Sequence, residues 1–154
     1  MERAGGGLIT IKNTQRKIKI NRNKTKLNIY KMLEISGYPD FDIGVWFTTN
    51  KTIREYSKKF RKKDKPTDIL SFPYHDKLKP GQKIVVKEPE DKNLGDIIIS
   101  VEFAKKEAQE KKLALEKYLQ ILLAHGIAHL LGFDHKTEKQ YKAMQEMERR
   151  LLES

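Results

Sequence analysis

The sequence predicts an α+β (α/β-like) fold, in which a small mixed β-sheet packs against helices and a buried helix carries two histidines suited to bind a metal. Strand patterns alternate with helical patterns in the front part of the chain, and helical patterns cluster in the back part. The helix expected from about Leu115 to Leu131 is apolar nearly all round, which is typical of a helix inside a protein.

The front of the chain begins with strand and helix signals. Residues 8–20 contain alternating β-branched residues and predict one strand or a hairpin. Residues 24–37 predict a helix that ends at Gly37, with Pro39 beyond it as a stop. Residues 41–48 alternate and predict a strand, one face of which carries Phe41, Ile43, Val45 and Phe47.

The middle of the chain alternates between the same two patterns. Residues 50–60 predict an amphipathic helix. Pro66 disfavours helix at the preceding residue, and TDILSF (67–72) then predicts a strand. Residues 75–93 are polar and are expected to form a mobile loop. LGDIIIS (94–100) is a continuous apolar run, which predicts a strand buried on both faces.

Three helices are predicted in the back part. Ser100 can cap the first, which is expected to run to about Lys112. The apolar helix follows, and Gly132 ends it. Thr137 and Gln140 form a capping box for the last helix. The residues of that helix expected to face inward are Tyr141, Met144, Met147 and Leu151.

Length and composition narrow the class of protein. The 154 residues predict a single domain over residues 1–154. The 32 Lys and Arg against 21 Asp and Glu produce a net charge of +11, which favours a polyanionic partner such as RNA, DNA or a ribosome. A strongly solvated surface would explain the same charge. Because the chain contains no cysteine, disulfides and thiolate zinc sites are excluded.

The sequence predicts a cytoplasmic protein. Its first residues, MERAGGGLITIK, lack the apolar core of a signal peptide. No run approaches the ~20 apolar residues that a membrane span needs, so no membrane partner is expected.

Three of the chain's histidines lie in HGIAHLLGFDH, residues 125–135. His125 and His129 are four residues apart on a predicted helix, so they project from one face and can share one ion. Gly132 allows the chain to reverse and to bring His135 to the same ion. Three imidazoles leave one tetrahedral position open, as in catalytic zinc sites. We therefore expect one Zn²⁺ per chain, although another divalent ion would suit the same ligands.

Gly126 stands where zinc proteases with the pattern H-E-x-x-H-x-x-G-x-x-H carry a catalytic glutamate. Glycine inside a helix costs about 1 kcal/mol relative to alanine. Two reasons remain open: space and neutrality for an anionic substrate beside the ion, or close packing of the helix. Asp134 either orients His135 or bonds the local backbone, and His75 is expected at the surface.

The segment KKFRKKDK (58–65) carries six positive charges against one aspartate. It is either a solvated stretch or a phosphate-binding surface. Arginine grips phosphate with two parallel hydrogen bonds, so Arg61 is the candidate catalytic residue. Arg61, Lys62 and Lys63 are the candidate substrate-binding residues.

Three motifs resemble one known family. HGIAHLLGFDH resembles H-G-x-L-H-L-x-G-Y-D-H, a signature of the YbeY family of bacterial rRNA-maturation endoribonucleases, with Ala128 and Phe133 replacing the usual leucine and tyrosine. FRKKDKPTDILSFPY is similar to the family's Y-R-x-K-D-x-P-T-D/N-V-L-S-F-P, with Lys62 at a frequent glycine. LGDIIIS is similar to L-G-D-I-x-I-S. The motifs span residues 60–135 in the family's order.

The resemblance implies that His125, His129 and His135 bind zinc and that Arg61 is the family's functional arginine. It further implies a single-strand-specific, metal-dependent endoribonuclease that matures the 3′ end of 16S rRNA and takes part in ribosome quality control. Attack on phosphorus by water and attack by the neighbouring 2′-hydroxyl are both compatible with these residues.

Two alternatives stay open at this point. The first is a zinc hydrolase or peptidase that lacks the usual glutamate and takes its base from elsewhere, with Asp96 and Glu102 as candidates. The second is a non-catalytic ribosome- or RNA-binding protein with a structural metal.

Overall fold

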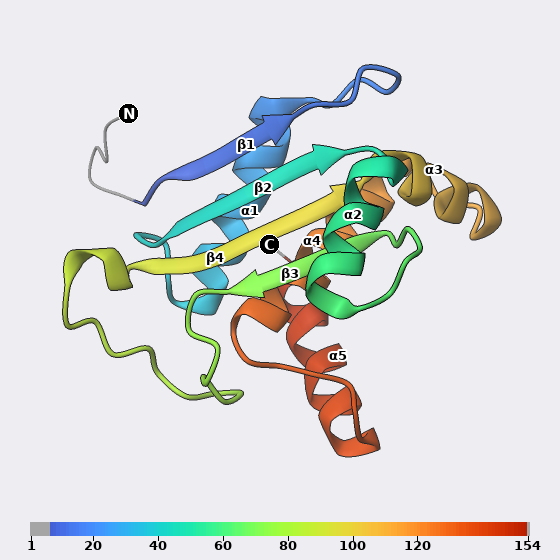
Figure 1. The fold of residues 1–154 in the computed structure, drawn as a ribbon. Helices are drawn as coiled ribbons and strands as arrows, with labels where there is room; N and C mark the ends of the chain where they lie inside the picture. Colours follow the sequence, from blue (N-terminus) through green and yellow to red (C-terminus); the bar gives the residue numbers. More distant parts are fainter. Residues whose placement is uncertain (1–6, 154) are drawn as a thin grey trace.

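The computed structural model describes residues 7–153, which form a four-stranded mixed sheet with helices on both faces (Figure 1). The strand order is β1-β2-β4-β3. The first three of these are parallel, and β3 runs antiparallel to β4 at the edge. The predicted mixed sheet is thereby confirmed. The strands are β1 (Ile9–Asn13), β2 (Asp42–Thr48), β3 (Ile69–Pro73) and β4 (Asn93–Ser100).

The helices form two unequal layers. Helices α1 and α4 lie behind the sheet in Figure 1, whereas α2 crosses its front. The helices are α1 (Arg22–Ser36), α2 (Asn50–Arg61), α3 (Val101–Glu110), α4 (Leu115–Leu130) and α5 (Glu138–Leu152), with a short 3-10 helix η1 (Pro89–Asp91). None of the helices in the described part of the chain is long and apolar enough to cross a membrane.

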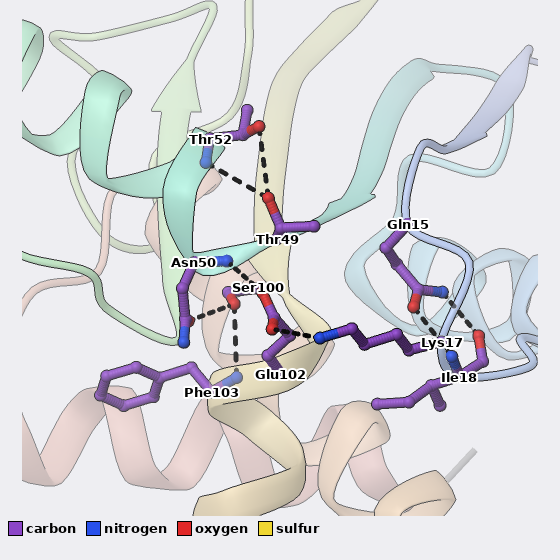
Figure 2. A network of polar contacts seen from close by, with 9 residues as sticks. All are labelled: Gln15, Lys17, Ile18, Thr49, Asn50, Thr52, Ser100, Glu102 and Phe103. Atoms are coloured by element: carbon purple, nitrogen blue, oxygen red, sulfur yellow. Dashed lines mark hydrogen bonds and ion pairs between the residues drawn. The ribbon is translucent and has the colours of Figure 1, made fainter.

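Local signals set the boundaries of several elements. Helix α1 ends at Gly37, whose φ of 91° lies in the left-handed region. Residues 8–20 are expected to form either one strand or a hairpin, and a single strand is observed. After Asn13 the chain leaves the sheet, and the Gln15 side chain bonds both backbone groups of Ile18 (Figure 2).

The main core lies between the sheet and the helices behind it. The predicted face of β2 is confirmed, since Phe41, Ile43, Val45 and Phe47 are all buried. In β4 three consecutive isoleucines, 97–99, are buried, as expected for a strand covered on both faces. Helix α4 is buried over most of its length, which confirms its predicted place inside the protein.

A polar network joins the start of α2 to the start of α3 (Figure 2). The Ser100 hydroxyl accepts a bond from the Phe103 amide and donates one, 2.7 Å long, to Asn50 Oδ1. Glu102 Oε1 accepts from the Asn50 amide at 2.8 Å. Ser100 is therefore the helix cap that the sequence predicts, and the same network holds α2 in place.

Two predictions need correction. Tyr141 is half exposed rather than facing inward, because α5 begins beyond the edge of the sheet and only its later turns reach the core (Figure 1). The loop over residues 75–93 is irregular, as predicted, but it is anchored to the core. Ile84 is buried, and its amide donates to the Tyr38 hydroxyl at 3.1 Å.

Candidate metal centre

Three histidines meet at the C-terminal end of α4. His125 and His129 project from one face of the helix, and His135 comes from the loop that follows it. One ligand nitrogen of each lies within 4.8 Å of the others. No other group of three or more such ligands occurs in the described residues. The convergence that the spacing predicts is therefore present.

Gly132 makes the reversal of the chain possible. Its φ is 95°, a conformation that side-chain-bearing residues rarely adopt. A Cβ at this position would also lie 2.3 Å from the Leu78 carbonyl oxygen. Glycine is thus required twice, once for the left-handed turn after α4 and once for the close approach of the loop over residues 75–93.

Hydrogen bonds to the far nitrogens orient two of the rings. His129 Nδ1 lies 2.9 Å from the Phe133 carbonyl oxygen, which can only accept. That nitrogen must therefore carry the proton, and Nε2 keeps the lone pair that a metal needs. His125 Nδ1 lies 2.7 Å from Glu148 Oε2, and the carboxylate assigns the same tautomer to this ring.

The electrostatics also favour ligand chemistry. Burial, and then the neighbouring His125 and His135, lower the pKa of His129. A lowered pKa keeps the imidazole neutral at neutral pH, and neutral imidazole is the form that binds metals. Three nitrogen donors without thiolates or carboxylates suit zinc, nickel or a similar divalent ion. The residues present therefore fit the expected metal.

Sequence reasoning missed Glu148. It lies on α5, 23 residues from its partner His125, with 23% of its side chain exposed. The available signal was its position four residues after Met144, which places a carboxylate on the buried side of the helix. An acid at such a position needs a partner, and the histidine supplies it.

The histidines line an open cleft of about 1140 Å³ with residues of α2 and β3. Arg61 lies at the C-terminal end of α2, and its Nη2 donates to the Ser71 carbonyl oxygen at 2.7 Å. Lys63 also lines the cleft. Lys62 caps α2 in the left-handed conformation, with φ 58°, and is not a lining residue. The structure thus brings Arg61 and Lys63, but not Lys62, to the histidines.

His75 differs from its prediction as a surface residue. It is half-buried in the cleft wall, and its Nε2 lies 2.8 Å from the Asp91 carbonyl oxygen. It is not part of the three-histidine group. Asp134 bonds the local backbone, which is one of the two roles proposed for it above, since its carboxylate accepts a hydrogen bond from the His135 amide at 2.8 Å.

Gly126 faces the sheet. A Cβ added there would lie 2.8 Å from Ile97 Cδ1 and 3.0 Å from Ile69 Cδ1. Gly126 is also absent from the cleft lining. Close packing of α4 on β3 and β4 therefore accounts for this glycine, whereas the alternative of space for a substrate finds no support.

Neither alternative base reaches the cleft. Glu102 is engaged by the Asn50 amide and by Lys17, whose Nζ lies 3.8 Å from Oε2 (Figure 2). Asp96 lines a different hollow, on the face of the sheet that carries α2. The peptidase alternative thus loses both of its candidate residues.

Comparison with known proteins identifies the family of the chain. The family model described as Endoribonuclease YbeY matches residues 10–154. Relatives named Endoribonuclease YbeY include one from Homo sapiens, 36% identical with 94% of this chain and 86% of that protein covered, and one from Aquifex aeolicus, 37% identical with 94% and 89% covered. The solution structure of TM1509 from Thermotoga maritima superposes with a TM-score of 0.56 at 25% identity, covering 95% of this chain and 90% of that one. The chain belongs to the YbeY family of endoribonucleases.

Proposed function

We propose that this protein is a metal-dependent, single-strand-specific endoribonuclease that matures the 3′ end of 16S rRNA and takes part in ribosome quality control in the cytoplasm. Family membership supports RNA as the substrate class. The observation that carries the proposal is the presence of three histidines placed to hold a metal, together with Arg61, in one open cleft of a protein with net charge +11.

The chain's own residues divide the work within the cleft. His125, His129 and His135 would hold one divalent ion, zinc by preference. Such an ion would polarise a phosphoryl oxygen and acidify a water. Arg61 is the catalytic candidate, because its guanidinium can hold the phosphate and offset negative charge that develops during cleavage. Its bond to Ser71 and its position over the Phe72 ring, 5.1 Å from the centroid, hold it in place.

The cleft favours a single strand. It is open, and both the three histidines and the basic residues Arg61 and Lys63 line it. An unpaired strand can bend its phosphate toward the histidines, whereas a stiff duplex keeps its phosphates on the outside of a helix. We propose Lys63 as a phosphate contact from within the cleft and Lys62 as one at its rim. Ribosome binding belongs to the same proposal.

Cleavage of an end-labelled single-stranded RNA, with and without a chelator, tests the function. We expect cleavage that stops with chelator and returns with added Zn²⁺, and slower cleavage of a matching duplex. Arg61→Lys, which keeps the charge but loses the two-pronged contact, should reduce kcat by tenfold or more while leaving the metal bound. Cleavage unaffected by metal removal would contradict a catalytic ion. A 2′,3′-cyclic phosphate product would identify the 2′-hydroxyl as the attacking group.

A further inference from the structure

The face of the sheet opposite α4 carries a second hollow. It has a volume of about 370 Å³ and is lined by residues of all four strands and of the second half of α2. We call this hollow the aromatic groove. It is lined by Thr10, Lys12, Gly44, Val45, Trp46, Tyr56, Phe60, Phe72, Asp96, Ile97 and Ile98.

Four rings form a continuous row along the groove. The centroid distances are 5.3 Å from Trp46 to Tyr56, 6.0 Å from Tyr56 to Phe60 and 5.4 Å from Phe60 to Phe72. Phe60 is 49% exposed, although it lies on the same face of α2 as the buried Ile53. No helix or strand in the described part of the chain covers this row of rings completely, so part of an apolar surface is left exposed.

A cation lies over each of three of the rings. Lys12 Nζ lies 4.2 Å from the centroid of the Trp46 ring system, Lys59 Nζ lies 5.2 Å from that of Phe60, and Arg61 Cζ lies 5.1 Å from that of Phe72. Rings for bases and neighbouring cations for phosphates are the two components of single-strand nucleic acid binding sites. The one acid of the lining, Asp96, offers a carboxylate that can accept from the amino group of a base.

The groove adjoins the cleft across strand β3. On α2, Phe60 lines the groove while its neighbour Arg61 lines the cleft. On β3, Phe72 lines the groove while its neighbour Ser71 lines the cleft and accepts from Arg61. An RNA strand that is held at Arg61 would therefore meet the groove as the next surface along its path.

We propose that the aromatic groove binds the bases of the RNA strand that flank the cleavage position, by stacking on Trp46 and Phe60. The proposal rests on the proposed function, because the strand it binds is the one that the cleft would cleave. Stacking tolerates any base, so the groove would extend the binding site without adding strong sequence preference.

Trp46 is the only tryptophan of the chain, so its fluorescence reports on the groove. The test titrates the whole protein, with chelator present, with a 2′-O-methyl single-stranded RNA twelve nucleotides long, which cannot use its 2′-hydroxyls for cleavage. We expect quenching of Trp46 emission that follows the binding curve from anisotropy of the labelled RNA. An abasic phosphate oligomer of equal length should bind with little quenching.

Phe60→Leu keeps apolar bulk but removes the ring face, and should weaken binding about 5-fold or more. Tyr30→Leu, at an exposed tyrosine of α1 behind the sheet, is the matched control and should bind as the parent does. RNA that binds without quenching, with Phe60→Leu binding as the parent does, would overturn the proposed role of the groove. Cleavage by the metal-loaded protein would still support the endoribonuclease. Quenching without any cleavage would keep the groove and remove the proposed function.

Discussion

Gly126 is the position at which this metal motif departs from zinc proteases, and its replacement tests why. A Cβ at Gly126 would lie 2.8 Å from Ile97 Cδ1 and 3.0 Å from Ile69 Cδ1. Carbon atoms pack best at about 3.5–4.0 Å, so these methyl groups must withdraw by roughly 0.5–1 Å. Both are the free ends of flexible side chains, which makes a small adjustment possible.

The expected magnitude follows from two opposing terms. Overpacking a core costs about 1–3 kcal/mol. Alanine in place of glycine within a helix recovers about 1 kcal/mol. Gly126→Ala should therefore be destabilised by about 0–2 kcal/mol, which corresponds to a fall in Tm of up to about 8 °C for a chain of this size. Gly126→Glu places a carboxylate among isoleucines and should lose several kcal/mol.

The assay measures Tm, metal content and RNA cleavage for both variants, together with Ile97→Val. Valine lacks the Cδ1 methyl group that an alanine at 126 would meet. The double variant Gly126→Ala/Ile97→Val should therefore be more stable than the sum of the two single changes predicts, by about 0.5 kcal/mol or more. Additive effects, or a fully stable and metal-loaded Gly126→Glu protein that fails only to cleave RNA, would refute the packing explanation.

Three further predictions concern the metal, the charge and pH. Removal of a bound ion should lower Tm, since the ion stabilises only the folded state. Glu148→Ala should weaken metal affinity by about 10–100-fold, and Glu148→Gln should weaken it less. Unchanged metal affinity of Glu148→Ala in a competition titration would contradict an orienting role of Glu148. Replacing Lys58, Lys59, Lys62 and Lys63 by Gln should flatten the salt dependence of RNA binding by up to about 0.7 per lysine, and an unchanged slope would make the segment a solvated face. Glu107 lies on α3, and Asp68 directly precedes β3. Burial and a hydrogen bond with Asp68 raise the pKa of Glu107 to about 7, so the unfolded chain loses this proton at lower pH than the folded protein, and stability should fall as pH rises from about 4.5 to 7. Glu107→Gln should remove this decline, and melting temperatures of Glu107→Gln that fall with pH as the parent's do would contradict the assignment.

The elements that the sequence predicted best are those with local signals. Gly37, Ser100 and the Thr137–Gln140 pair mark helix ends through contacts within a few residues, and all three are confirmed. The meeting of the histidines is equally local, because one helical turn and one glycine reversal define it. Such features depend on backbone geometry near the residues themselves, so the sequence contains enough information to place them.

Features that depend on contacts between distant segments could not be placed. The partner of His125 lies on another helix, and its identity depends on how α5 packs against α4. The same dependence explains Tyr141, which follows the helical pattern of its neighbours but lies on a turn that the core does not reach. The row of rings likewise joins β2, α2 and β3, and the sequence pattern of each element shows only its own members.

The packing of Gly126 also bears on the site through the position of α4. The glycine lets α4 approach β3 and β4 more closely than any larger residue would. The same strand β3 carries Ser71, the carbonyl of which holds Arg61. Close approach of the helix therefore sets how far the histidines lie from the arginine across the cleft. A glutamate at this position, as in the proteases, would push the helix away from the strand. Gly126 therefore contributes to the site because it has no side chain between α4 and β3.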